Sequence, residues 1–454
     1  MAVAVTVTEA GATRAAGWGW TTGAPLGLLA LTHFLMQADR NLPALVLPLL
    51  KQQFRLSDTA LGLLQGPAFV LFFVASTLVA GQVADRMPHL KVLAVSILLW
   101  TLAGVGFGMA QTWEQLVLCR LLLGLCQALV QPTALSLIVA RTPAQDVGRS
   151  ISVFTTGSAL GRSGAMLLGG ALLAWSASPL VRSAFPGLEV WRVLFFLSAL
   201  PNLLVAAGLL FVDGRGATRP AVGQALERRP SMRSALEQMR VRPAAFGVHL
   251  VAAGCVIVLI QAASAWLPTL LQRELAVSPA RSGLISGLIV LAGAPLGHLG
   301  GGALADLCRR AGRPPSLVIV AALTLCGIGA GLLCLPPTLA SLSLGFFMLT
   351  VFGGAAAVVF LAMYQPMLAA AHGASNAVFF AVTTLVGVGL GPPVIGLLSD
   401  RVFGPGQLGL SLFCTTLAAG LTASLLAWGN RRAWSSAVRA ADAGRLKEMT
   451  RHDG

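Results

Sequence analysis

Long apolar runs separated by short polar segments dominate the chain. Most of these runs reach about 20 residues, the length that an α-helix needs to cross a hydrocarbon core of ~30 Å. Membrane-spanning β-strands would instead be short and would alternate apolar with polar residues. The pattern predicts twelve membrane-spanning helices, near residues 23–48, 58–83, 90–110, 114–140, 147–175, 190–212, 244–270, 280–306, 315–335, 338–368, 372–399 and 407–428.

A polar segment in the middle of the chain divides the twelve runs into two sets of six. We therefore predict an all-α membrane protein made of two six-helix bundles joined by a linker. Composition agrees, because 56% of the residues are hydrophobic and only 10% are charged, which is unlike an average soluble domain. The predicted parts are an N-terminal tail, an N-terminal bundle, a linker, a C-terminal bundle and a C-terminal tail, at residues 1–22, 23–212, 213–243, 244–428 and 429–454.

The charge distribution predicts the orientation of the chain in the membrane. The formal net charge is +15, and Lys and Arg concentrate in the loops on the side of the two termini. Cytoplasmic loops carry such an excess, so we expect a multi-pass protein of the plasma (inner) membrane with both termini in the cytoplasm. In a soluble chain this charge would indicate nucleic-acid binding; here topology accounts for it, and we expect no nucleic-acid partner. The seven cysteines form no CxxC pair, and we expect neither a metal site nor a cofactor.

Four charged residues lie well inside the predicted spans, away from the span ends: Asp39, Arg40, Arg120 and Arg162. Each costs at least ~2.5 to 3.5 kcal/mol at the centre of a bilayer, so such residues tend to be functional. At ~1.5 Å of rise per residue, Asp39, Arg120 and Arg162 fall at a similar depth, roughly 20 Å from the inner boundary. This layer has three cations and one acid, and arginine suits carboxylate or phosphate. We predict that the three arginines bind an anionic substrate and that Asp39 exchanges protons.

A purely structural alternative remains for each of these residues. Arg120 and Asp39 could form a packing ion pair, and Arg162 could bond helix carbonyls or snorkel to the membrane interface. His33 precedes Asp39 by six residues; it is a candidate proton relay or, alternatively, a hydrogen-bonded packing histidine.

Similar motifs recur about half the chain apart, which indicates an internal repeat. GQVADRMPHLK at 81–91 is echoed by GGALADLCRRAGRPP at 301–315, and GLLSDR follows at 396–401. The first motif resembles the G-x-x-x-D-R signature that the major facilitator superfamily carries between its second and third spans. The resemblance implies that superfamily's fold and an inner latch in the outward-open state. The gating candidates are Gly81, Asp85, Arg86, Lys91, Asp306, Arg309, Arg310, Asp400 and Arg401.

Residues 38 to about 161 carry a finer resemblance. ADRNLPALVLPLLKQQFRLSDTALGLLQGPAFVLFF, GQVADR and LCRLLLGLCQAL look like the spinster-type branch, and are also similar to the anion:cation symporter branch. Both branches have a proton-handling carboxylate seven residues after the span 4 arginine, where this chain has Gln127, which cannot titrate. In the superfamily, spans 1, 4, 7 and 10 line the central cavity. The resemblance thereby adds substrate-binding candidates Gln37, Gln127, Trp266, Tyr364 and Gln365.

We therefore expect a secondary transporter in the lipid bilayer, acting as a monomer. It would move a small organic anion or an amphipathic lipid-like anion by alternating access, with protons as partners through Asp39. The alternatives are an uncoupled uniporter or exchanger, a drug-type efflux carrier and, from another class, a non-transporting membrane receptor. No paired-carboxylate, Ser/His/Asp or metal-ligand set lies in the charged layer, so we do not expect an enzyme.

Overall fold

The computed structural model describes residues 24–142, 146–212, 237, 239–367, 372–404 and 406–452. Within these ranges, the side chains at 24, 78–79, 81–86, 365, 372–374 and 442–452 fall outside the description. The described residues form helices and no strand. This all-α arrangement confirms the predicted fold class.

The described residues of the N-terminal half form ten helical segments. Apolar runs form its long helices, and Gly and Pro interrupt them where the backbone cannot continue. The segments are α1 (Ala24–Asn41), α2 (Pro43–Phe54), α3 (Asp58–Gln65), α4 (Pro67–Arg86), α5 (His89–Met109), α6 (Trp113–Gln127), α7 (Val130–Arg141), α8 (Val147–Ser176), α9 (Pro179–Ala184) and α10 (Val190–Phe211).

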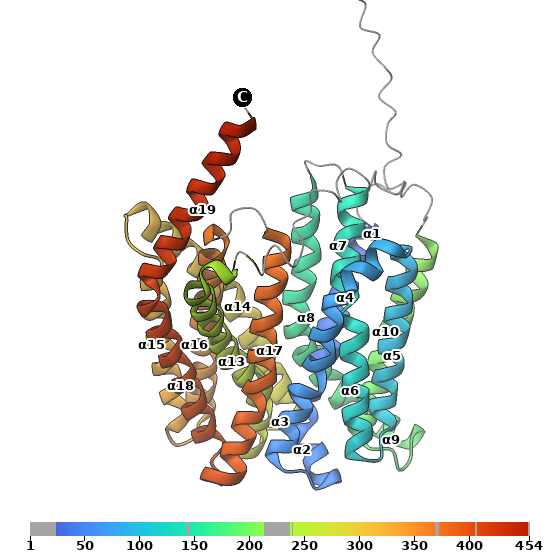
Figure 1. Ribbon diagram of the computed structural model, residues 1–454. Coiled ribbons are helices and arrows are strands. Elements are labelled where there is room, and N and C mark those ends of the chain that lie inside the picture. Colours follow the sequence, from blue (N-terminus) through green and yellow to red (C-terminus); the bar gives the residue numbers. More distant parts are fainter. Residues whose placement is uncertain are drawn as a thin grey trace, which may run out of the picture.

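The C-terminal half has longer, less interrupted helices. They are α13 (Pro243–Glu274), α14 (Pro279–Arg310), α15 (Ser316–Gly331) with the short η2 (Leu332–Cys334), α16 (Leu339–Tyr364) with η3 (Gln365–Met367), α17 (His372–Leu398) with η4 (Ser399–Phe403), and α18 (Leu408–Gly429). A last helix, α19 (Arg431–His452), follows. It rises from the same side of the molecule as the start of α1, the upper side in Figure 1, which we call the terminal side.

Ten membrane-spanning candidates are found among the described residues by length and composition. The two further predicted spans, 23–48 and 147–175, correspond to α1 with α2 and to α8. Pro43 interrupts the first of these, and α8 carries Arg149 and Arg162 among many small and hydroxyl-bearing residues. These two predicted spans are therefore not among the ten candidates, and both carry charged residues into the bundle.

The two halves approach most closely at the side opposite the termini. There α3 and α4 pack on α17, α2 packs on α13, and α8 packs on α14. A Cβ atom on Gly62 would lie 2.5 Å from the Pro392 carbonyl oxygen, and one on Gly170 would lie 2.9 Å from that of Ala280. These glycines let backbones of the two halves touch, so the bundle is closed on the opposite side.

The surface of the bundle suits a lipid environment. Large apolar side chains stand exposed on its helices, for example Leu102, Leu204, Leu299 and Leu425 at 65–75% exposure. A soluble monomer rarely exposes so much contiguous apolar surface. The interior, by contrast, holds two apolar cores, one within the N-terminal half and a larger one that extends through the C-terminal half and the contacts at the opposite side.

Candidate functional site

A central cavity lies between the two halves. It has about 860 Å³ of empty space, including the part open to solvent. Five helices line it: α1, α8, α13, α14 and α16. Its polar lining residues are Asn41, Arg162, Gln261, Ser264, Ser286, His298 and Thr350, and its apolar ones include Met166, Ile257, Ile260, Leu267, Val290 and Phe346. No Asp or Glu occurs among the described residues that line it.

Arg162 reaches the cavity because its helix lies tight against α1. A Cβ on Gly157 would lie 2.1 Å from the Ala30 oxygen, and one on Gly161 would lie 2.4 Å from the Phe34 oxygen. The glycine spacing in GSALGRSG therefore brings α8 onto α1 and sets the following arginine at the edge of the cavity. The buried Nε of Arg162 has no hydrogen-bond partner among the described residues.

Arg120 has a different environment from Arg162. Its Nε donates to the Leu64 carbonyl at 3.1 Å, Nη1 to that of Arg40 at 3.1 Å and Nη2 to that of Gln65 at 3.4 Å. These carbonyls lie where α1 gives way to α2 and α3 to α4, beside prolines that cannot donate a backbone hydrogen bond. Arg120 is buried and braces both breaks, and it does not line the central cavity.

Arg40 and Arg120 both contact the aromatic ring of Phe69. Its guanidinium carbon is 4.4 Å from the centre of the Phe69 ring and 5.5 Å from that of Phe73. Arg120 lies 5.4 Å from the same Phe69 ring. The ring faces offset part of the cost of burying these cations, and neither arginine belongs to an ion pair among the described residues.

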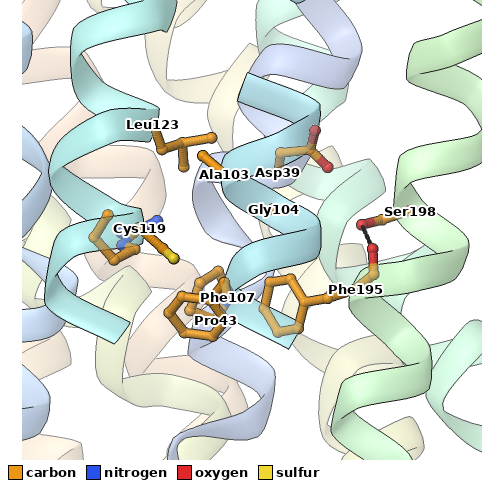
Figure 2. Close-up of a pocket in the computed structure, with 10 residues that line it drawn as sticks. Asp39, Pro43, Ala103, Gly104, Phe107, Cys119, Leu123, Phe195 and Ser198 are labelled. Carbon is orange, nitrogen blue, oxygen red and sulfur yellow. Dashed lines mark hydrogen bonds between the residues drawn. The ribbon is translucent and has the colours of Figure 1, made fainter. Parts of the chain in front are cut away.

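Asp39 is directed away from the central cavity. Its Oδ2 accepts hydrogen bonds from Trp100 Nε1 at 3.1 Å and Asn202 Nδ2 at 2.6 Å. Figure 2 shows it beside Gly104 of α5 in a small side pocket that Ser198 of α10 also lines. The Asp39–Arg120 ion pair considered as an alternative is not among the described ion pairs.

Three other candidates join α1 to its neighbours inside the N-terminal half. His33 contacts the Phe154 carbonyl through Nδ1 at 3.1 Å and stacks on the Phe154 ring at 4.3 Å. Gln37 donates to Ser158 Oγ at 2.7 Å, and Gln127 donates to the Met36 carbonyl at 3.1 Å. The geometry of His33 is that of a packing histidine between α1 and α8.

Two candidates from spans 7 and 10, Trp266 and Tyr364, are not among the residues that line the central cavity. Trp266 is fully buried and donates to the Pro392 carbonyl at 3.1 Å, so it joins α13 to α17. Tyr364 is also buried and donates to the Ser375 carbonyl at 3.0 Å. The side chain of Gln365 lies outside the described residues. The cavity is instead lined from spans 7 and 10 by residues such as Gln261 and Thr350.

The gating candidates fall at both sides of the bundle. The side chains of Gly81, Asp85 and Arg86 lie outside the described residues. Of the others at the terminal side, Asp306 pairs with Arg309 one helical turn away, and both Lys91 and Arg310 are exposed. Asp400 and Arg401 lie at the opposite side, in the π-helical turn that ends α17.

Sequence reasoning missed an acid at the opposite side, Asp58. Its carboxylate is fully buried and pairs with Lys51 at 2.6 Å and with Arg273 of the other half at 2.7 Å. Ser399 donates to it at 2.8 Å. The acid begins α3 directly after the capping residue Ser57, so the sequence marks it only as a helix start.

Asp400 completes this contact from the C-terminal half. It accepts hydrogen bonds from the backbone N–H groups of Asp58 and Thr59 at 3.0 and 2.7 Å and from the Thr59 hydroxyl at 2.6 Å. An acid of one half thus occupies the N-terminus of a helix in the other, where the helix dipole favours negative charge. We call the set Lys51, Asp58, Arg273, Ser399 and Asp400 the opposite-side latch.

Comparison with known proteins gives one family and several similar chains. The family described as Major Facilitator Superfamily matches residues 29–392. An MFS-type efflux pump of Mycolicibacterium smegmatis is 27% identical over 89% of this chain and 91% of its own. A gallate transporter of Pseudomonas putida is 29% identical over 84% of this chain and 85% of its own.

The fold has a solved counterpart at low sequence identity. The structure of a bacterial homologue of the human lysosomal transporter Spinster, inward-facing and unoccupied, aligns with a TM-score of 0.74. It covers 96% of this chain and 99% of the solved one, at 20% identity.

Proposed function

The chain belongs to the Major Facilitator Superfamily, and we propose that this membrane-spanning transporter carries a small organic anion by alternating access. The observation that supports the proposal most is Arg162. Its buried Nε has no partner among the described residues, and no described acid lines the cavity that it faces. A desolvated arginine needs a counter-charge, and its planar fork fits a carboxylate.

The relatives support the same substrate class. The gallate transporter of Pseudomonas putida aligns with most of this chain, and gallate is a small aromatic carboxylate. The mostly apolar lining of the cavity, with polar groups at a few points, fits a ligand with one charged end and an apolar body.

Alternating access would proceed by opening and closing the two ends of the bundle. The opposite side is closed by the opposite-side latch and by glycine contacts between the halves. If the termini are cytoplasmic, as the Lys and Arg distribution predicts, this is the inward-facing state. Export or import then requires that the latch open while the terminal side closes.

Proton coupling through Asp39 forms the second part of the proposal. Asp39 is held by α5 and α10, whereas the neighbouring Arg40 faces α4. Protonation of Asp39 would weaken the hydrogen bonds that Trp100 and Asn202 donate to it, and would so loosen α1, the helix that also supplies Asn41 to the cavity. Gln127 cannot supply a second titrating group, so coupling would use this one carboxyl.

Transport by the purified full-length protein in liposomes tests both parts. We expect uptake of radiolabelled gallate or benzoate, with a proton signal from a trapped pH-sensitive dye. Arg162→Ala should lower uptake at least tenfold, because a hydrogen bond to a charged group contributes ~1.5–3 kcal/mol. The matched control is Arg182→Ala, which removes an exposed arginine of α9 and should leave uptake unchanged.

Each part has its own refuting outcome. Uptake no greater than in protein-free liposomes would refute the transport of such anions. Full transport activity of Arg162→Ala would show that Arg162 does not bind the substrate anion. Uptake without a proton signal, unchanged in Asp39→Asn, would mark the protein as a uniporter or exchanger.

A drug-type efflux carrier is the second candidate, because the efflux pump of Mycolicibacterium smegmatis matches nearly the whole chain. The single fixed cation among the described cavity residues disfavours cationic drugs. Transport of ethidium but of no organic anion in the same liposomes would decide for this candidate.

A further inference from the structure

Two polar groups without partners face the central cavity from opposite halves of the protein. Arg162 of α8 has an unpartnered buried Nε, and Ser286 of α14, only 2% exposed, has an unpartnered Oγ among the described residues. Thr350, another hydroxyl in the cavity wall, donates to the Phe346 carbonyl of its own helix at 2.8 Å. Ser286 makes no such bond, although a serine in a helix commonly does.

The packing of α8 on α14 sets these two groups near each other. A Cβ on Gly283 would lie 2.6 Å from the Met166 oxygen, and one on Gly287 would lie 2.5 Å from the Leu167 side chain. Ser286 lies between these two glycines on α14, and Arg162 lies one helical turn, ~5.4 Å, from Met166 along α8. Both side chains line the same cavity.

We propose that Arg162 and Ser286 together bind the carboxylate of a compact monocarboxylate, one oxygen accepting from Nε–H and the other from the serine hydroxyl. The inference rests on the proposed function and names the substrate class of that site. The Arg162 guanidinium can only donate and the Ser286 hydroxyl is able to donate, so the pair suits an acceptor-only head such as a carboxylate. One fixed cation among the described cavity residues matches a single negative charge.

The remaining cavity wall defines the body of the ligand. Ile257 and Ile260 of α13 and Phe346 of α16 are apolar and line the same space, so the part of the ligand beyond its carboxylate is apolar. We infer a compact apolar body such as a benzene ring, and a long-chain anion serves as the contrasting probe. The carboxylate also joins α8 to α14, so that ligand binding ties the two halves together.

Binding to the purified full-length protein in detergent, measured by calorimetry, tests the inference. The probes are benzoate, its neutral analogue benzamide, and lysophosphatidate as a long-chain anion. We expect benzoate to bind and the other two to bind at least tenfold more weakly. Ser286→Ala should weaken benzoate binding about fivefold to tenfold, the effect of one hydrogen bond, and Arg162→Ala should weaken it more than tenfold.

A double-mutant cycle shows whether the two residues hold the same carboxylate. If they do, the losses in Ser286→Ala and Arg162→Ala are not additive, and the double variant loses less than their product. The control is Ser163→Ala, which removes a buried serine beside Arg162 whose hydroxyl donates to the Leu160 carbonyl at 3.0 Å. It should bind benzoate as the wild type does, and all variants should keep the wild-type melting temperature within about 2 °C.

The outcomes separate this inference from the proposed function. Wild-type affinity for benzoate in Ser286→Ala, or strictly additive losses, would overturn the inference and leave anion transport standing. Tighter binding of lysophosphatidate than of benzoate would overturn the compact substrate class alone. Failure of the wild type to bind or transport any anion would overturn the proposed function and this inference with it.

Discussion

Replacing Asp58 with asparagine perturbs the opposite-side latch while keeping the size of the side chain. The buried carboxylate of Asp58 bonds Arg273 twice, at 2.7 and 2.9 Å, and Lys51 at 2.6 Å. Asparagine removes the negative charge and leaves the two cations next to each other. Asp400 of the C-terminal half, which accepts hydrogen bonds at the N-terminus of α3, remains in place.

The magnitude follows from the burial of the partners. Removing one member of a fully buried ion pair costs ~3–5 kcal/mol. The side chains of Lys51 and Arg273 are 28% and 19% exposed, so water can solvate the cations that lose their partner. We therefore expect a smaller loss of free energy, about 2–3 kcal/mol. Arg273 belongs to the other half, so most of this loss falls on the state closed at the opposite side. Since 1.4 kcal/mol is a factor of ten, the closed population should fall about 30-fold to 150-fold relative to the open one.

The assay is the distance between two spin labels across the latch. Gln52 of the N-terminal half and Val402 of the C-terminal half are both exposed at the opposite side, and cysteines can be introduced there in a background without the seven native ones. Pulsed electron–electron double resonance on the spin-labelled Asp58→Asn variant should show a new population with a longer distance between the two labels. The control Glu189→Gln removes an exposed acid before α10 and should leave the distribution unchanged. Identical distributions in Asp58→Asn and the control would refute the reasoning.

Two further perturbations test the packing around the site. Arg120→Ala leaves the Leu64, Gln65 and Arg40 carbonyls without this donor and should lower the free energy of unfolding by about 2–4 kcal/mol; a melting temperature equal to that of wild type would contradict its role as a brace. Gly161→Val would place side-chain atoms within 2.4 Å of the Phe34 oxygen and should prevent α8 from packing on α1. A normal yield of folded Gly161→Val protein in detergent would show that this contact can relax. The control is Gly148→Val, because a Cβ at that position would meet no atom within 4 Å.

The amino-acid sequence by itself determined that the protein is helical and where its long apolar segments lie, and ten of the twelve predicted spans are membrane-spanning candidates among the described residues. Span length and hydropathy are properties of contiguous residues, because a helix in lipid satisfies its backbone hydrogen bonds within itself. The excess of cations over acids in the membrane layer was also readable, and so was the superfamily, since its signature is a contiguous motif. The two predicted spans outside these ten, α1 with α2 and α8, were still predicted from the sequence, because Pro43 and a few charged residues interrupt an apolar run without shortening it.

Only the tertiary structure decided where the charged and polar side chains are directed. Depth along a helix placed Asp39, Arg120 and Arg162 in one layer, but rotation about each helix axis directs Asp39 to Trp100, Arg120 to backbone carbonyls and Arg162 to the cavity. The same limit hid the opposite-side latch, whose Asp58 and Arg273 are separated by 215 positions. Such contacts depend on how two six-helix halves dock, which no local pattern of residues records.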